Sequence, residues 1–161
     1  METLTPSSVC RHTRIHLTTT LPTEFIDLTD RLQEFVAATG IRSGILNVQT
    51  LHTTTAIFLN EHEPLLLTDF AALLETAVPA HGRYRHDDAS VRTVNVTEEE
   101  RSNGHAHCRA LLLPTTASLN VIDGRLVLGR WQRVFLAELD GPRERAISVL
   151  VIGECGGEAG V

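Results

Sequence analysis

TTASLNVIDGRLVLGRWQRVFLAELDGPRERAISVLVIGE, residues 115–154, decides the fold because branched and aromatic residues fill it between two sharp turn signals. Asp123-Gly124 is typical of a tight hairpin turn, and Asp140-Gly141-Pro142 ends the next apolar run. The pattern predicts strands over 115–122, 125–129, 131–139 and 145–154, arranged as consecutive strands of a meander. The last third of the chain is therefore β-rich.

Working toward the N-terminus, the chain alternates between strand and helix patterns. Residues 9–17 predict an edge strand, and apolar spacings of three and four after Pro22 predict a helix over 23–39 that Gly40 ends. Two β-rich segments, 44–51 and 53–60, predict either a strand pair or one long bent strand, with His52 near the bend.

Two further helices and a long loop complete the prediction. Pro64 suits the first turn of a helix that runs to Val78, residues 80–103 predict a surface loop, and Ser102 or Asn103 can cap a helix over 104–113. The sequence therefore predicts one α+β domain over 1–161, a mostly antiparallel sheet or sandwich covered by three helices. The ends, 1–8 and 155–161, are expected to fray.

Composition excludes several classes of function. The net charge of −6 argues against nucleic-acid binding, and no apolar run is long enough to cross a membrane. All 14 basic residues are arginine, so a lysine Schiff base is excluded and arginines must meet any phosphate. Three widely spaced cysteines and the absence of a secretory signal predict reduced thiols in the cytoplasm.

The segment His105-Ala106-His107-Cys108 is the densest cluster of chemical groups. On a strand both histidines would share a face, but on a helix they diverge by about 200°, so only one can face inward. Cys108 beside them is a nucleophile or, as we expect, a small buried residue.

Acidic and basic groups outside this segment remain open to two interpretations. Glu61 lies either at the rim of a pocket or at the N-terminal dipole of the helix that begins at Pro64. Asp87 either orients His86 or belongs with it to a solvated loop. Trp131 is typical of core packing, and Glu138, inside an apolar strand, needs a partner.

These segments together resemble the YjbQ family, whose members are described as secondary thiamine-phosphate synthases. The resemblance rests on residues 52–61 (HTTTAIFLNE), Asp69-Phe70, Tyr84-x-His86-Asp87, 103–107 (NGHAH) and 123–143. It runs from about residue 44 to residue 154, and the LGxWQ block is its most specific part.

The resemblance implies a compact α+β homotrimer with a pocket near the subunit boundaries. His52, His86 and His107 fall on the family's recurrent histidines, which we expect to hold a divalent metal, zinc or magnesium. The expected catalytic residues are Glu61, Asp69, Gln132 and Glu138, with Glu61 or Glu138 as proton carrier. Contacts to substrate are expected from Asn60, Arg83, Arg130, Trp131 and Arg143.

Three residues depart from the family pattern. His105 falls on no recurrent position, Arg130 stands where a threonine is usual, and Pro114 stands where a glycine is usual. The arginine next to Trp131 could add a phosphate contact or fill part of the pocket.

The implied reaction condenses a pyrimidine methyl diphosphate with a thiazole phosphate. The implied partners are a small phosphorylated molecule and further copies of the chain, with no nucleic acid and no membrane. Two alternatives stay open: a histidine-bound zinc hydrolase of phosphate esters or amides, and a metabolite-binding trimer without catalysis.

Overall fold

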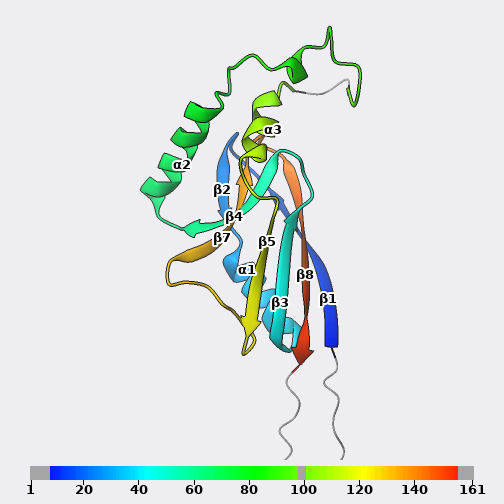
Figure 1. Ribbon diagram of the computed structural model, residues 1–161, viewed down its shortest axis with the longest axis vertical. Coiled ribbons are helices and arrows are strands. Elements are labelled where there is room, and N and C mark those ends of the chain that lie inside the picture. The colour runs from blue at the N-terminus through cyan, green and yellow to red at the C-terminus, as the bar shows by residue number, and fades with distance from the viewer. Residues whose placement is uncertain (1–7, 98–100, 156–161) are drawn as a thin grey trace, which may run out of the picture.

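The computed structural model describes residues 8–97 and 101–155 and contains two antiparallel sheets (Figure 1). The five-stranded sheet has the order β1-β8-β3-β5-β6, and the three-stranded sheet has the order β2-β7-β4. The strands of the first are β1 (Ser8–Thr18), β8 (Glu144–Cys155), β3 (Ile41–Thr50), β5 (Thr116–Ile122) and β6 (Arg125–Leu126). Those of the second are β2 (Glu24–Asp27), β7 (Gln132–Glu138) and β4 (Thr55–Glu61).

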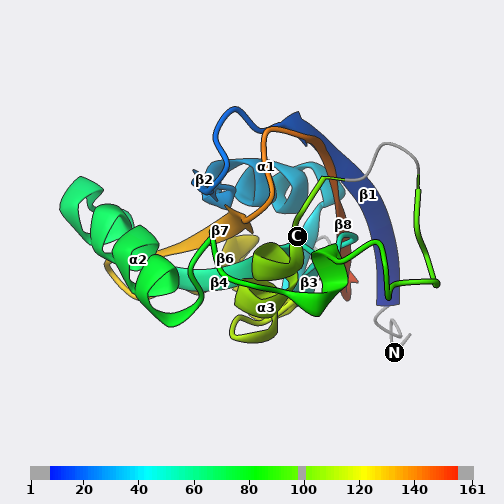
Figure 2. The same cartoon turned by 90° about the horizontal axis from the view of Figure 1, so that it is seen from above.

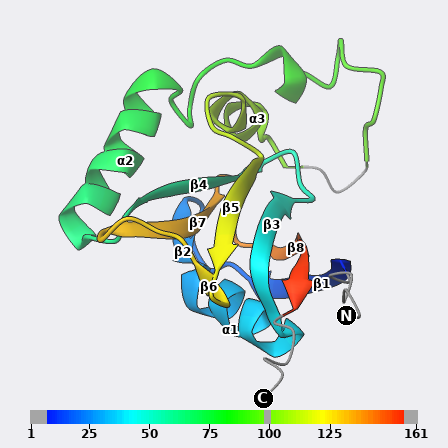
Figure 3. The same ribbon diagram turned by 60° about the horizontal axis from the view of Figure 1, so that its bottom comes forward.

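The main core lies between the two sheets and the helix α1 (Thr29–Thr39). Alternate residues of β8, Ile147, Val149 and Val151, are buried in it, as period-two alternation requires. Leu32 and Val36 of α1 are fully buried against them. Figure 3 shows α1 on one side of the strands, with the other helices on the opposite side.

A second, smaller core joins the three-stranded sheet to the helices α2 (Pro64–Ala77) and α3 (Gly104–Leu111). Phe25, Phe58 and Phe70 form edge-to-face contacts with ring centroids about 6 Å apart. Only Leu74 of α2 is buried, and Figure 2 shows this helix extending away from the body. The predicted α+β class with three helices is confirmed.

One predicted helix divides into a strand and a helix. Residues 24–27 form β2, which pairs with β7 from Glu24↔Glu138 to Asp27↔Phe135, and α1 begins only at Thr29. The strand completes a sheet around β7, so tertiary pairing outweighs the local helical spacing. The predicted end at Gly40 is confirmed, because this glycine adopts φ 73°.

The predicted meander is wrong beyond its first hairpin. β5 and β6 pair around Asp123-Gly124, but β7 lies in the other sheet and β8 returns to lie between β1 and β3. Residues 134–138 of β7 are buried on both faces, and only a central position between covered layers provides that. β3 and β4 likewise belong to separate sheets, so 44–60 is neither a strand pair nor one long strand.

The structure places the ends of α2 and α3 near their predicted positions but caps these helices differently. Pro64 opens α2, whose first amides donate to the Glu63 carboxylate, so Glu61 does not cap it. Asn103 precedes α3 without a side-chain cap. Asp87 accepts hydrogen bonds from the amides of Asn103 and Gly104, both at 2.9 Å.

The ends of the described chain are regular. Ser8 and Cys155 belong to β1 and β8, and the rest of the two segments expected to fray, 1–7 and 156–161, lies outside the described residues. The helices that the structure describes include none long and apolar enough to span a membrane. The edge position of β1 agrees with prediction. So does the loop between α2 and α3, whose described residues contain only one short 3₁₀ turn (Arg85–Asp87).

Candidate functional site

A cavity of about 660 Å³ lies where four segments meet. They are the β3–β4 connection, the loop before α3, the N-terminal half of α3 and the residues around the start of β8. The described residues that line it include His52, His86, His107, Arg92, Asn103, Asp140, Arg143 and Arg145. We call it the histidine–arginine cavity. Its volume suits a small-molecule ligand.

His52 lines this cavity from the β3–β4 connection, with its tautomer fixed by the backbone. The amide of Ala146 donates a hydrogen bond to His52 Nε2 at 2.8 Å. A neutral imidazole that accepts at Nε2 carries its proton on Nδ1. Burial lowers the pKa of His52, and the nearby Arg145 guanidinium lowers it further. The neutral ring therefore presents Nδ1–H as a donor.

His86 and His107 line the same cavity, His86 from the loop and His107 from α3. Their ring centroids are 4.6 Å apart in an edge-to-face arrangement. Asp87 is turned away to the N-terminus of α3, so it does not orient His86 through its carboxylate. His105 lies beside the Tyr84 ring instead of the cavity, at a centroid distance of 6.3 Å. As the helical geometry predicts, only one histidine of the pair faces inward.

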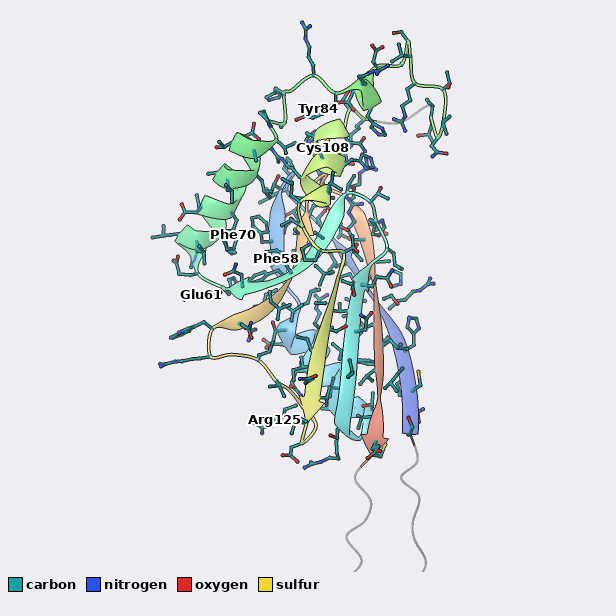
Figure 4. The ribbon with its side chains drawn as sticks, viewed as in Figure 1. Phe58, Glu61, Phe70, Tyr84, Cys108 and Arg125 are labelled. Carbon is teal, nitrogen blue, oxygen red and sulfur yellow. The ribbon has the colours of Figure 1, made fainter. Side chains whose placement is uncertain are left out.

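Close packing holds this end of α3. A Cβ built on Gly104 would come 2.4 Å from the Tyr84 Cβ, so only glycine allows the loop to approach the helix this closely. Cys108, which was expected to be buried, lies on α3 and is exposed. Cys10 on β1 and Cys155 on β8 are exposed as well. Figure 4 shows Cys108 and Tyr84 near each other at this end of the molecule.

Acid–base pairs surround the cavity at the start of β8. Arg143 Nη2 contacts Asp140 Oδ2 at 2.8 Å, and Asn103 Nδ2 donates to the same oxygen at 3.0 Å. Below them Glu138, fully buried, binds Arg145 through two hydrogen bonds. Arg145 lines the cavity, whereas Glu138 does not.

Most of the other predicted site residues lie elsewhere. The register of β4 with β7 pairs Thr55 with Glu138 at one end and Glu61 with Gln132 at the other. Six residues at about 3.3 Å each separate these ends by about 20 Å. Glu61 and Gln132 therefore do not reach the cavity of their own chain, and Figure 4 shows Glu61 far from Tyr84.

The remaining predicted residues are exposed and also lie outside the cavity. They are Asn60, Asp69, Arg83, Arg130 and Trp131. Trp131 is 60% exposed, against the expected core packing, and its ring carries the Arg130 guanidinium at 4.5 Å. Arg130 therefore fills no part of the cavity.

The three histidines do not fit a shared metal ion as they stand. The Nε2 lone pair of His52 is engaged by the Ala146 amide, and its Nδ1 carries the proton. Within residues 8–97 and 101–155, no group of three or more His, Cys, Asp or Glu side chains is suited to hold a metal. Two neighbouring imidazoles, His86 and His107, are what remains of the predicted ligand set.

Sequence reasoning missed Arg145, Arg92, Asp140 and Asn103. Arg92 donates to the carbonyls of His86 and Asn95 and so shapes the loop wall. Arg145 is the second residue of β8, and it lies on the same inward face as Ile147 and Val149, so the alternation of the strand was a usable signal. The contacts of Arg92 and Asn103 depend on a loop whose path no periodic pattern predicts.

Comparisons with known proteins agree with the fold. A family model described as "UPF0047 protein YjbQ-like" matches residues 13–154. A UPF0047 protein of Methanothermobacter thermautotrophicus is 41% identical over 86% of this chain and 89% of its own length. YugU of Bacillus subtilis is 30% identical over 86% of this chain and 97% of its own length.

Solved structures show the same architecture. A YbjQ-like protein from Sulfolobus solfataricus P2 superposes with a TM-score of 0.82 and 33% identity, covering 92% of this chain and all of the other. A yjbq/upf0047 family protein from Clostridium acetobutylicum gives a TM-score of 0.76 at 30% identity, covering 86% of this chain and 98% of the other. The chain belongs to the YjbQ-like UPF0047 family.

Proposed function

We propose that the histidine–arginine cavity binds a small phosphorylated molecule. The observation that carries the proposal is its lining: among the residues that the structure describes, three arginines, three histidines and one carboxylate, that of Asp140, line the cavity. Guanidinium groups and imidazole N–H groups are preferred partners of phosphate oxygens. The 660 Å³ volume accommodates a heterocycle together with its phosphate group.

We infer that the reaction is of the thiamine-phosphate synthase type. The C–O bond between the pyrimidine methylene and the diphosphate breaks, and its electron pair leaves with pyrophosphate. The lone pair of the thiazole nitrogen then forms the new C–N bond, which gives thiamine phosphate. Because negative charge accumulates on the leaving diphosphate, catalysis depends on fixed cations and hydrogen-bond donors around it.

The chain supplies these groups from the cavity walls. Arg143 and Arg145 provide positive charge, and His52 provides a neutral N–H donor. His107, on α3, lines the same cavity, and we expect it to contact the reacting end of a ligand. No proton transfer between carbon atoms is required, so the reaction does not need Glu61 as a base.

Incubation of the purified protein with both thiamine precursors tests the proposal, with thiamine phosphate followed by chromatography. His107→Ala should reduce the rate at least about 100-fold, a loss typical of removing a donor to developing charge. His105→Ala is the matched control, since it removes an imidazole from the same helix outside the cavity. Equal loss in both variants, or no product from the wild type, would contradict the proposal.

The same condensation assay should be repeated with added magnesium and with a chelator. The lone-pair assignment at His52 argues against a three-histidine zinc centre and hence against a zinc hydrolase. A panel of chromogenic phosphate esters and amides addresses that alternative directly. Hydrolysis that zinc restores after chelation would favour it over condensation.

We also propose a homotrimer, on the family resemblance and on one surface. The outer face of the five-stranded sheet exposes Ile45 (55%) and Ile152 (46%), which are paired directly across β3 and β8. A subunit seated there would remove both from water. Light scattering should give three times the chain mass, and Ile45→Asp should reduce it. The exposed, unpaired cysteines suit a reducing compartment such as the cytoplasm.

A further inference from the structure

A buried ion pair lies directly beneath the cavity. Glu138, at the end of β7, is fully buried, and Arg145, near the start of β8, is 5% exposed. Arg145 Nε donates to Glu138 Oε2 at 2.5 Å and Nη2 donates to Oε1 at 2.6 Å, a two-point contact. Nη2 also donates to the Thr54 hydroxyl at 3.0 Å. The guanidinium plane is therefore fixed by three contacts.

The donor count of Arg145 leaves one nitrogen for a ligand. A guanidinium has five N–H groups, one on Nε and two on each Nη. The contacts to Glu138 and Thr54 use those of Nε and Nη2. Nη1 has no hydrogen bond to a residue that the structure describes, and Arg145 lines the cavity. Both hydrogens of Nη1 are available there.

Glu138 is itself held rigidly. Besides Arg145, its carboxylate accepts from the Thr19 hydroxyl at 3.0 Å and from the amides of Leu139 and Asp140 at 2.9 and 2.8 Å. Burial alone would raise the pKa of Glu138, but the hydrogen bonds from Arg145 and the Asp140 amide outweigh it and lower the pKa. An ionised carboxylate that is held by these contacts and does not line the cavity is better suited to position Arg145 than to carry a proton.

Stability alone is a poor reason for this arrangement. Removing two charges from water is costly, and buried ion pairs are often replaceable by apolar residues without loss of stability. The pair does, however, aim an arginine at the cavity. The amide of Ala146, which follows Arg145, donates to His52 Nε2, so the same segment of β8 also fixes the His52 Nδ1–H donor.

We propose that Arg145 Nη1 and His52 Nδ1–H form a preorganised subsite for an oxygen of the leaving diphosphate, and that Glu138 and Thr54 are positioning residues for Arg145. The inference rests on the proposed function for the identity of the anion, but its test uses inorganic pyrophosphate alone. Lysine cannot replace Arg145, because one ammonium group cannot bind Glu138 at two points and face the cavity as well.

Calorimetric titration with inorganic pyrophosphate tests the subsite. Arg145→Lys should weaken pyrophosphate binding at least tenfold. Arg133→Lys is the matched control, because Arg133 also binds carboxylates, those of Asp27 and Asp30, but lies outside the cavity. Equal affinity of wild type and Arg145→Lys, or no binding to the wild type, would overturn the inference.

Two further measurements serve if Arg145→Lys does not fold. Thr54→Val removes one of the three contacts and should weaken pyrophosphate binding about threefold while the chain stays folded. In a nitrogen-15 NMR spectrum, the Arg145 Nε–H signal of the wild type should shift on adding pyrophosphate, whereas that of Arg133 should not. A stationary Arg145 signal at saturating pyrophosphate would contradict the subsite, since a purely structural arginine gives that result.

The two proposals can fail separately. If pyrophosphate binding depends on Arg145 but no thiamine phosphate forms, the subsite stands and the proposed reaction falls. If thiamine phosphate forms at the wild-type rate in Arg145→Lys, the reaction stands and the subsite falls.

Discussion

The two ends of the β4–β7 pair carry similar residues in opposite surroundings. At one end Thr55 lies opposite Glu138, and the acid is buried with five hydrogen bonds beneath a cavity. At the other, Glu61 lies opposite Gln132, and both are exposed. A polar residue in an apolar strand is therefore informative only together with its position along the strand and the face on which it lies.

The largest expected difference between the ends concerns stability. Glu138→Ala leaves the Arg145 guanidinium buried without its partner, which typically costs about 3–5 kcal/mol and lowers the melting temperature by about 10 °C. Glu61→Ala should leave the unfolding midpoint unchanged, because its side chain is exposed. Thermal unfolding followed by circular dichroism measures both. Similar midpoints for the two variants would contradict the contrast.

Two glycines, one near the cavity and one at the far end of the β4–β7 pair, test the same contrast in packing. Gly104→Ala places a methyl group 2.4 Å from the Tyr84 Cβ and should cost about 1–3 kcal/mol by overpacking. Gly129→Ala, at the far end, meets only the flexible Gln132 amide at 3.2 Å and should cost less. Urea unfolding gives both values. A larger loss at Gly129 would show that the far end is the more tightly packed.

The pH dependence of stability also distinguishes the cavity. Because burial lowers the pKa of His52 below its ordinary value of about 6.5, the unfolded chain binds the proton more readily. Stability is therefore full above about pH 6.5 and declines as the pH falls toward the lower folded-state pKa. His52→Asn should reduce this acid-side decline, measured as the unfolding midpoint between pH 7 and pH 5. Replacement of His16, exposed on β1, is the control, and an identical decline in both variants would contradict the assignment.

The smallest effect is expected at Trp131. Arg130→Ala removes a guanidinium 4.5 Å from an exposed ring, a contact worth about 0.5 kcal/mol at such sites. Tryptophan fluorescence should change, whereas pyrophosphate affinity should not. A loss of affinity would show that the far end takes part in binding, most simply from a neighbouring subunit.

Much of the fold follows from local patterns. Alternation predicts β1 and β8, Pro64 and Gly40 mark helix ends, and the Asp123-Gly124 turn pairs β5 with β6. Local patterns do not say which sheet a strand joins, so β7 and the split between β3 and β4 require tertiary pairing. Residues 24–27 are a further example, because their local spacing predicts a helix but they form a strand that pairs with β7.

Part of the candidate site could also be predicted from the sequence. The family resemblance and the divergence of His105 from His107 select three histidines that line one cavity. The acids could not be sorted, because nothing local distinguishes Glu138, which faces a buried arginine, from Glu61, which faces solvent. Arg145 was not predicted as a site residue, because a charged residue next to a turn usually lies on the surface.

A crystal structure of the protein grown with inorganic pyrophosphate tests the central claim most directly. The account predicts pyrophosphate density inside the histidine–arginine cavity, with an oxygen within hydrogen-bond distance of both Arg145 Nη1 and His52 Nδ1. Pyrophosphate bound instead around Glu61 and Gln132 of one chain, with that cavity holding only water, would contradict it.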